Sequence, residues 1–329
     1  MRYILTAQAD ALPLALREAG GPKVARYLMP GVALCEGVTP HKKPIFLRHL
    51  CPAEIEVPLE GTPFDMEGLQ RGLSSSLLER LHAGTRFSVQ SVIAEGYTPA
   101  YKRFDVNEAL SSAIIAQTGA ELSVKRPEWV LSVFLAQGTG WLGLSTPAEN
   151  LSDWAGGMRR FKWEEGQISR AEFKLLEALE VFGVPLSDGM RALDLGAAPG
   201  GWTRVLRRRG LYVTAVDPAD LDPRLARDTR VTHVKATAQA YLRSPAPCDL
   251  MVNDMKMDSA ESAALTAQGA ACLRPGGAVI LTLKLPENTE KWFPLVARAG
   301  SILAKAYRVE NIRQLFHNRN EATVCLTKL

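Results

Sequence analysis

The spacing of hydrophobic positions changes near the middle of the chain. In the first half, alternating or short apolar runs predict strands over residues 2–7, 24–29, 32–36, 86–93, 129–135 and 140–144. Apolar positions three and four apart predict helices over residues 13–20, 64–81 and 105–117. Asp105 is the expected N-cap of the last of these helices. Together these elements predict an α+β region.

A stretch without a clear period, residues 145–166, predicts a domain boundary because it mixes Pro, Gly and Asn with bulky aromatic residues. Beyond it, strands and helices alternate. Strands are predicted over residues 192–195, 211–216, 231–234, 249–252, 278–285, 306–316 and 322–326. Helices are predicted over residues 169–182, 201–209, 259–272 and 292–303. This alternation predicts a mostly parallel seven-stranded α/β sheet whose last two strands form an antiparallel pair at one edge.

Composition narrows the class of protein. A length of 329 residues, with 47% hydrophobic and 22% charged residues, indicates a globular protein of about two domains. No apolar run reaches the length of a membrane span, and the first residues lack the apolar core of a signal peptide. The five cysteines form no C-x-x-C pair, which argues against a disulfide framework and against a zinc site. We therefore expect a cytoplasmic protein without a bound metal.

Basic residues are clustered, although the net charge is only +4. The clusters are Lys42-Lys43, Lys102-Arg103, Lys125-Arg126, Arg159-Arg160 with Lys162, and Arg204 with Arg207-Arg208-Arg209. One such cluster is most often solvated surface. Their recurrence makes a polyanionic partner plausible.

A glycine-rich loop joins a predicted strand to a predicted helix. It contains Asp194, Gly196, Ala198, Pro199, Gly200, Gly201 and Trp202. Glycines allow a ligand to approach the backbone, and the helix N-terminus offers free N–H groups. The spacing G-x-x-x-G-G matches neither the dinucleotide fingerprint nor the phosphate-binding P-loop. A tight structural turn is the alternative interpretation.

Asp217 ends the next predicted strand. A carboxylate at this position can accept hydrogen bonds from both hydroxyls of a ribose, so the loop and Asp217 predict a site for an adenosine-containing cofactor. The loop resembles that of S-adenosylmethionine-dependent methyltransferases. Its run Asp-Leu-Gly-Ala-Ala-Pro-Gly-Gly-Trp resembles in particular the FtsJ-type RNA 2′-O-ribose methyltransferases, which have a Rossmann-like class I methyltransferase fold.

This resemblance implies a catalytic Lys–Asp–Lys–Glu tetrad, and each member has a matching position. The segment Ser-Arg-Ala-Glu-Phe-Lys-Leu resembles the family's S-R-A-x-x-K-L and supplies Lys174. Asn-Asp-Met resembles S-D-M and supplies Asp254, which the resemblance also places beside the cofactor. Leu-Lys-Leu supplies Lys284, and Asn-Arg-Asn-Glu supplies Glu321. Ordinary charges at strand ends are the alternative.

The implied reaction is attack of a ribose 2′-oxygen on the methyl carbon of a sulfonium ion, and it requires a base. Burial and a neighbouring like charge both lower the pKa of a lysine from its ordinary value of about 10.4. We therefore expect Lys284, with a lowered pKa, to be the general base and Lys174 to hold the ribose. Asp254 and Glu321 would orient the two lysines.

Other methyl-transfer chemistries fit less well. Enzymes that methylate amino groups generally carry Asn/Asp-Pro-Pro-aromatic after the fourth strand, where this chain has Asn-Asp-Met-Lys. Cytosine-5 enzymes use a cysteine nucleophile, but Cys248 precedes the strand instead of following it. Two positions depart from the closest subgroup of the family: Ala236-Thr237 stands where an acidic residue contacts the adenine, and Ala171 stands where a serine is found.

Residues 87–147 resemble a THUMP domain, an RNA-binding module, most clearly at Lys125-Arg126-Pro127-Glu128-Trp129-Val130. A strand that merely begins with two cations is the alternative. We expect a ferredoxin-like α+β region over residues 1–80, a THUMP-like domain over 81–150 and the methyltransferase domain over 151–329. This order resembles bacterial enzymes that methylate a cytidine 2′-hydroxyl of 23S ribosomal RNA or its precursor. A transfer-RNA enzyme, a metabolite enzyme and a non-catalytic assembly factor that binds the cofactor remain alternatives.

Overall fold

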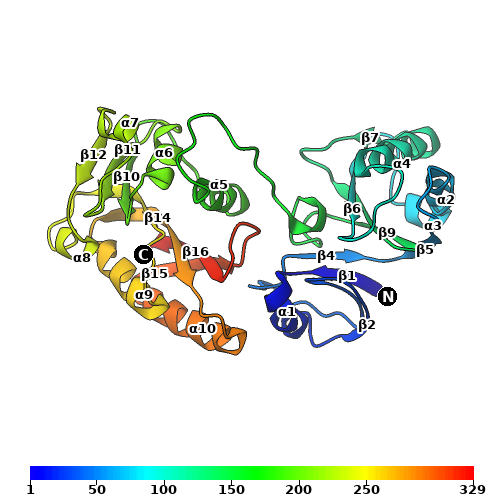
Figure 1. Ribbon diagram of the computed structural model, residues 1–329, viewed down its shortest axis with the longest axis horizontal. Helices are drawn as coiled ribbons and strands as arrows, with labels where there is room; N and C mark the ends of the chain where they lie inside the picture. The colour runs from blue at the N-terminus through cyan, green and yellow to red at the C-terminus, as the bar shows by residue number, and fades with distance from the viewer. The chain divides into compact units, whose positions relative to one another are not determined.

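The computed structural model describes residues 1–329 and divides into two compact units, Met1–Arg159 and Arg160–Leu329. Figure 1 shows the chain from end to end. The division falls within the stretch of residues 145–166 that lacks a clear period. None of the helices is both long enough and apolar enough to cross a membrane.

The N-terminal unit begins with a four-stranded antiparallel sheet of order β2-β3-β1-β4. Its strands are β1 (Arg2–Thr6), β2 (Lys23–Met29), β3 (Val32–Glu36) and β4 (His49–Pro52). The short helices η1 (Ala9–Ala11) and α1 (Leu12–Glu18) connect β1 to β2. Strand β4 was not predicted because its four residues begin with His49 and end with Pro52, and therefore form neither an apolar run nor an alternating pattern.

A second sheet follows, of order β5-β9-β8-β6-β7. Its strands are β5 (Ile55–Pro58), β6 (Arg86–Ile93), β7 (Glu121–Leu122), β8 (Trp129–Ala136) and β9 (Thr139–Ser145). Its helices are α2 (Asp65–Arg71), α3 (Ser75–Leu78) and α4 (Arg103–Thr118), and η2 (Ala155–Gly157) lies near the end of the unit. Strands β8 and β9 are antiparallel and are joined by a two-residue turn, residues 137–138.

The single helix predicted over residues 64–81 is wrong, because an extended Ser74 separates α2 from α3. The apolar period hid this break, since Leu69, Leu73 and Leu77 all enter the same core on both sides of it. Asp105 is also not the N-cap of α4. It lies three residues inside the helix, and its carboxylate accepts the backbone N–H of Lys102, the actual N-cap, at 2.7 Å.

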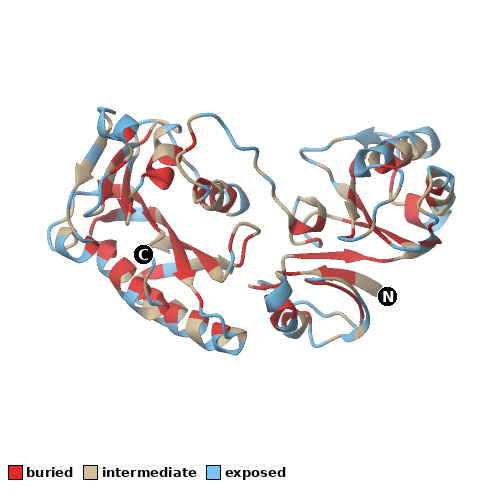
Figure 2. Ribbon diagram, viewed as in Figure 1, coloured by how far each residue is buried: buried red, intermediate tan, exposed pale blue.

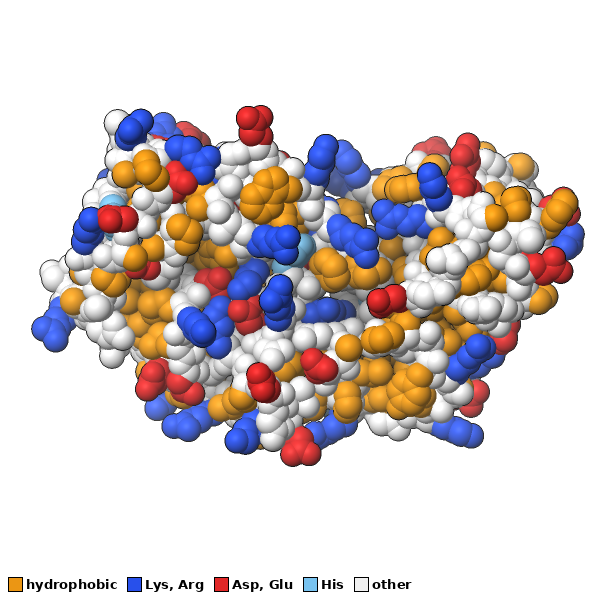
Figure 3. Space-filling view, in the orientation of Figure 1, with side chains coloured by type: hydrophobic (Ala, Val, Ile, Leu, Met, Phe, Trp, Pro, Cys, Tyr) orange, Lys and Arg blue, Asp and Glu red, His pale blue; other side chains and the backbone are white.

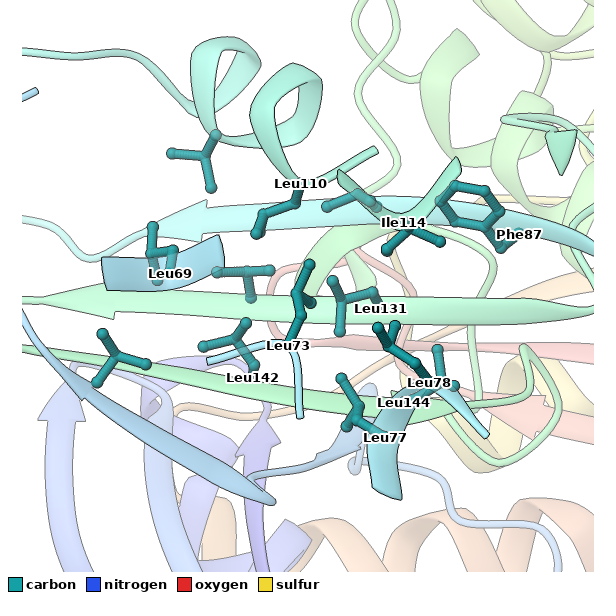
Figure 4. Close-up of a cluster of buried hydrophobic side chains, with 14 of the residues drawn as sticks. Leu69, Leu73, Leu77, Leu78, Phe87, Leu110, Ile114, Leu131, Leu142 and Leu144 are labelled. Atoms are coloured by element: carbon teal, nitrogen blue, oxygen red, sulfur yellow. The ribbon is translucent and has the colours of Figure 1, made fainter. Parts of the chain in front are cut away.

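Alternation along the strands gives the second sheet two buried faces. On β8, Leu131, Val133 and Leu135 enter a core with α2, α3 and α4, which Figure 4 shows in close-up. Phe134 and Ala136 point to the opposite face and join a core with residues of β1 and β3. The first core extends from Val57 to Leu144, so the domain boundary expected at residue 80 falls within it.

The C-terminal unit has the predicted Rossmann-like α/β architecture. Its sheet has the order β12-β11-β10-β13-β14-β16-β15. The strands are β10 (Arg191–Leu195), β11 (Tyr212–Val216), β12 (Val231–Val234), β13 (Cys248–Asn253), β14 (Leu273–Lys284), β15 (Tyr307–Arg313) and β16 (Glu321–Lys328). Strand β16 is antiparallel to both β14 and β15. The second strand from this edge of the sheet therefore runs opposite to both of its neighbours.

Helices cover both faces of this sheet, as Figure 1 shows. They are α5 (Glu172–Val181), α6 (Gly201–Arg207), α7 (Pro223–Ala226), α8 (Ala238–Tyr241), α9 (Ser259–Gln268) and α10 (Trp292–Leu303), with η3 (Gly269–Ala271) and η4 (Thr289–Lys291). On β13, Leu250 and Val252 join the core under α5 and α6, whereas Met251 joins the core under α9 and α10. The central strands are therefore buried on both sides, which Figure 2 shows in red.

Candidate active site

Charged side chains collect where the parallel strands of the C-terminal unit end. Asp254 follows the last residue of β13, and Lys284 is the last residue of β14. Glu321 begins the antiparallel β16 and is the register partner of Lys284. Adjacent parallel strands end at one edge of a sheet, where ligands of α/β proteins bind. The fold therefore gathers residues that are far apart in the sequence.

Lys174, from α5, completes a ring of alternating charges with these three residues. Its Nζ lies 2.8 Å from the carboxylate of Glu321 and 3.3 Å from that of Asp254. Lys284 Nζ lies 2.8 Å from Glu321 and also donates to Asp254. Each lysine thus contacts both acids, and we call these four residues the tetrad. Their side chains are 14–21% exposed, so they remain accessible to a small ligand.

The protonation expected for Lys284 is wrong for the protein without ligands. Burial disfavours its charge, but the carboxylates of Asp254 and Glu321 outweigh burial and raise the pKa of Lys284 above its ordinary value. Burial likewise disfavours the charge of Glu321, and Lys284 and Lys174 lower the pKa of that carboxyl. The sequence prediction considered the positive charge of Lys174, which by itself lowers the pKa of Lys284. It left out the carboxylates of Asp254 and Glu321, each of which contacts both amines and raises that pKa.

Buried polar side chains, which we did not predict, fix the position of two tetrad members. Asn253 is fully buried, and its side-chain amide donates to Ser262 and Thr266 of α9. Its carbonyl oxygen accepts the N–H of Met255 at 3.0 Å, which holds the turn that presents Asp254. Ser259 donates to the backbone oxygen of Lys284 at 2.5 Å. A polar residue in an otherwise apolar strand was the signal available for Asn253.

Glu177 fixes the loop that leads to Glu321. It is only 3% exposed and lies on α5, one turn after Lys174. Its carboxylate accepts the N–H groups of Phe316 and His317 at 2.8 and 2.9 Å and the Nδ1 of His317 at 2.8 Å. The helix that carries one tetrad residue is therefore tied directly to the loop that positions another.

The glycine-rich loop lies beside the tetrad. Gly196 and Gly200 have φ angles of +74° and +112°, in the region that favours glycine. A Cβ atom at Gly196 would overlap Met255, and one at Gly200 would overlap Leu225. Side chains therefore pack closely against one side of this turn. Gly201 begins α6, and Ala198 and Pro199 lie between Gly196 and Gly200.

Two acids accompany this loop. Asp217 follows β11, and its carboxylate accepts the N–H groups of Ala198 at 3.1 Å and Ala219 at 2.8 Å. Asp194 lies in β10, is only 2% exposed and accepts the hydroxyl of Thr203 at 2.7 Å. Burial raises the pKa of Asp194 to about 7, and the charges of Asp254 and Asp217 act in the same direction. The three carboxylates therefore lie close enough for their charges to interact.

The raised pKa of Asp194 makes stability depend on pH. Between its ordinary pKa of 3.8 and about 7, the folded protein binds a proton that the unfolded chain releases. The contribution to stability is present at low pH and is lost as pH rises through 7. We expect Asp194→Asn to be more stable than wild type at pH 8, on the order of 2–4 kcal/mol, and the difference to shrink toward pH 5.

Urea denaturation of both proteins at several pH values measures this difference. Asp188→Asn, at a side chain that is 76% exposed, is the control and should show no such trend. A difference between wild type and Asp194→Asn that stays constant with pH would contradict the assignment.

The structure places Trp202 and the arginine cluster of α6 in surroundings that the sequence did not predict. The side chain of Trp202 is only 4% exposed, and its Nε1 donates to the backbone of Ala171 at 2.8 Å. The arginine cluster of α6 is largely neutralised. Arg204 pairs with Glu172 at 2.6 Å, Arg207 pairs with Asp228 at 2.9 Å, and Arg208 pairs with Glu164. The acids that pair with these arginines are distant from them in the sequence.

The two departures from the family pattern have structural roles here. Thr237 is the N-cap of α8, and its hydroxyl accepts the N–H of Ala240 at 3.2 Å. Lys235 at the end of β12 pairs with Asp220. Ala171 is the N-cap residue of α5, and its backbone oxygen is the acceptor for Trp202.

Comparison with known proteins identifies the family. A model of the FtsJ-like methyltransferase family matches residues 167–323, which contain the loop and the whole tetrad. Ribosomal RNA large subunit methyltransferase M of Methylococcus capsulatus is 36% identical over 203 residues, 58% of this chain and 55% of that protein. The chain thus spans little more than half the length of this relative.

A longer match comes from Thauera aminoaromatica. Its ribosomal RNA large subunit methyltransferase M is 32% identical over 309 residues, 88% of this chain and 80% of that protein. Among solved structures, TrmN from Thermus thermophilus covers the whole of both chains at 17% identity, with a TM-score of 0.41, too low to inform on function. The identity and coverage of the Thauera protein show that the chain belongs to the family of ribosomal RNA large subunit methyltransferase M.

Proposed function

We propose that this protein transfers a methyl group from S-adenosylmethionine to a ribose 2′-hydroxyl of 23S ribosomal RNA or its precursor, in the bacterial cytoplasm. The observation that carries the proposal is the tetrad, in which two amines and two carboxylates meet at the ends of β13 and β14, beside the glycine-rich loop. Family membership supports the same substrate class, since the relatives are named as methyltransferases of large-subunit ribosomal RNA.

The loop residues suit this cofactor. S-adenosylmethionine carries a positive sulfonium and a positive ammonium group, and it supplies an electrophilic methyl group when bound. Asp217 and Asp254 are acids near Gly196 and the following turn, and their charges act on Asp194. Asp217 already accepts two backbone N–H groups, which fix its orientation at the end of β11 for the hydroxyls of a ribose.

Within the tetrad, we assign proton acceptance to Lys284. Its neutral amine would take the proton of the 2′-hydroxyl, and the resulting ammonium would be held by Asp254 and Glu321. Lys174 would donate to the ribose oxygen from the other side of the ring. Because each acid contacts both amines, the four side chains hold one another in place before substrate binds, which lowers the entropic cost of alignment.

We propose that the N-terminal unit binds the RNA and that residues 87–147 form a THUMP-like module. Lys102, Arg103, Lys125 and Arg126 are exposed on it. Arg103 lies 4.8 Å from the ring of Phe104, which is 64% exposed, and such cation–aromatic pairs suit contacts with phosphates and bases. Figure 3 shows Lys and Arg side chains on the visible face of both units.

A methyl-transfer assay tests this function. The full chain is incubated with tritiated S-adenosylmethionine and unmodified transcripts of 23S ribosomal RNA or transfer RNA, and 2′-O-methyl positions are then mapped. We expect label in 23S RNA at one ribose, with RNA affinity that falls steeply as salt rises. Label in transfer RNA alone would move the substrate to that class. No label in any RNA, despite cofactor binding, would favour a non-catalytic assembly factor.

A further inference from the structure

An open pocket of about 700 Å³ adjoins the tetrad in the C-terminal unit, and the proposed chemistry does not use it. Lys174 and Glu321 line it on one side. Five aromatic side chains line the rest: Phe161, Trp163, Phe173, Phe316 and His317. Its size and its largely aromatic lining with a few charged groups are both typical of small-molecule sites.

The aromatic rings form a connected wall. Phe161 stacks on Phe173, with ring centroids 5.8 Å apart and planes 14° apart. Trp163 meets Phe173 edge to face at 6.2 Å and 88°. His317 lies 5.3 Å from Phe173 and 5.4 Å from Phe161. Each ring is therefore held by at least one other ring, and the wall is built before any ligand arrives.

Two features keep this wall in place at the tetrad. Phe173 precedes Lys174 on α5, so wall and amine share one rigid helix. Glu177, on the same helix, accepts the ring Nδ1 and the backbone N–H of His317. Trp163 nevertheless remains 52% exposed. A large indole that contacts a neighbouring ring but is left half open to solvent points to a flat ligand.

The entrance of the pocket is cationic. Arg170 and Arg319 are exposed lining residues, and neither has a carboxylate within 4 Å. This contrasts with the arginines of α6, which pair with acids of the same unit. Guanidinium groups bind phosphate through paired hydrogen bonds, so these two positions suit the backbone of a nucleic acid.

We propose that this pocket receives the base of the nucleotide whose ribose is methylated, stacked against Trp163, with Arg170 and Arg319 on the flanking phosphates. The proposal rests on the proposed function. A ribose held by Lys174 directs its own base into the adjoining space, because base and 2′-oxygen belong to one sugar and Lys174 lines this pocket. Stacking on aromatic rings is how proteins hold bases that have left a helix.

The test uses the full chain with Trp163→Ala, Trp163→Phe and Tyr212→Ala. Tyr212 is the matched control, since it is 46% exposed and is the first residue of β11, at the opposite end of the parallel strands from the tetrad. Initial rates of methyl transfer to 23S transcript give KM for RNA and kcat. Fluorescence anisotropy gives the affinity for a labelled single-stranded oligoribonucleotide, and calorimetry gives that for S-adenosylmethionine.

We expect Trp163→Ala to raise KM for RNA and to weaken oligoribonucleotide binding roughly tenfold, with cofactor affinity unchanged. Trp163→Phe should recover most of this loss, and Tyr212→Ala should resemble wild type. If the active wild type and Trp163→Ala have equal KM and equal affinity, the pocket does not hold a base. If wild type transfers no methyl group but Trp163→Ala still loses RNA affinity, the proposed function is wrong, whereas the assignment of the pocket as an RNA-binding site is kept. A loss of cofactor affinity equal to that for RNA would indicate a packing role and overturn the proposal.

Discussion

Lys284→Ala should lower methyl transfer to RNA about 10²- to 10⁴-fold, the range of general-base catalysis, while cofactor affinity changes little. Lys284 is the tetrad amine at the end of β14, and it donates to both Asp254 and Glu321. Its removal leaves Lys174 to balance both acids, so the cluster keeps one of its two positive charges. Single-turnover rates with saturating RNA measure the effect, and calorimetry measures cofactor binding.

Lys284→Arg separates charge from proton transfer. Arginine keeps the positive charge between the two acids but does not lose its proton in proteins. We expect this variant to be as well folded as wild type and nearly as inactive as Lys284→Ala. Substantial activity in either variant would exclude Lys284 as the base.

The pH dependence of the wild-type rate follows from the same residue. The two carboxylates raise the pKa of Lys284, so only a small fraction of the amine is neutral at pH 7. Because the neutral amine is the form that accepts a proton, the rate should increase with pH from 7 to 9 and not level off near neutrality. A rate that stays flat over this range would show either another base or a much lower pKa in the complex.

Glu177→Ala should destabilise the protein by at least about 3 kcal/mol, because three donors lose one buried acceptor at roughly 1–3 kcal/mol each. Those donors are the N–H groups of Phe316 and His317 and the ring of His317. We also expect a lower kcat, since the released loop leads to Glu321. Glu177→Gln keeps an acceptor oxygen and should lose less of both.

Chemical denaturation and the transfer assay measure these two effects. Glu261→Ala is the control, because Glu261 is an exposed glutamate in the first turn of α9. Its replacement should change stability by less than about 0.5 kcal/mol. A Glu177→Ala protein as stable as this control would mean that the loop is held by other contacts.

Local patterns were enough to locate the tetrad but not the elements that lack a pattern. Asp254 and Lys284 were located by the resemblance of short motifs to the FtsJ-type family, and the structure places both at the ends of parallel strands. Strand β4 is buried throughout and shows no alternation. The break at Ser74 was hidden because leucines on both sides of it enter one core. Hydrophobic periodicity reports which side of a segment is buried, and it is silent about where a helix is interrupted.

The alternation of strands and helices in the C-terminal unit and the glycine loop were determined by the sequence itself, because each depends on a short run of residues, and short motifs shared with the family located the four tetrad positions. Only the tertiary structure decided the charge state of Lys284, since its pKa depends on acids that β13 and β16 bring to it. The same holds for the link between Glu177 and His317, which are 140 residues apart in the chain. Electrostatic and hydrogen-bond energies depend on distances in space, and those distances are set by the packing of the whole unit.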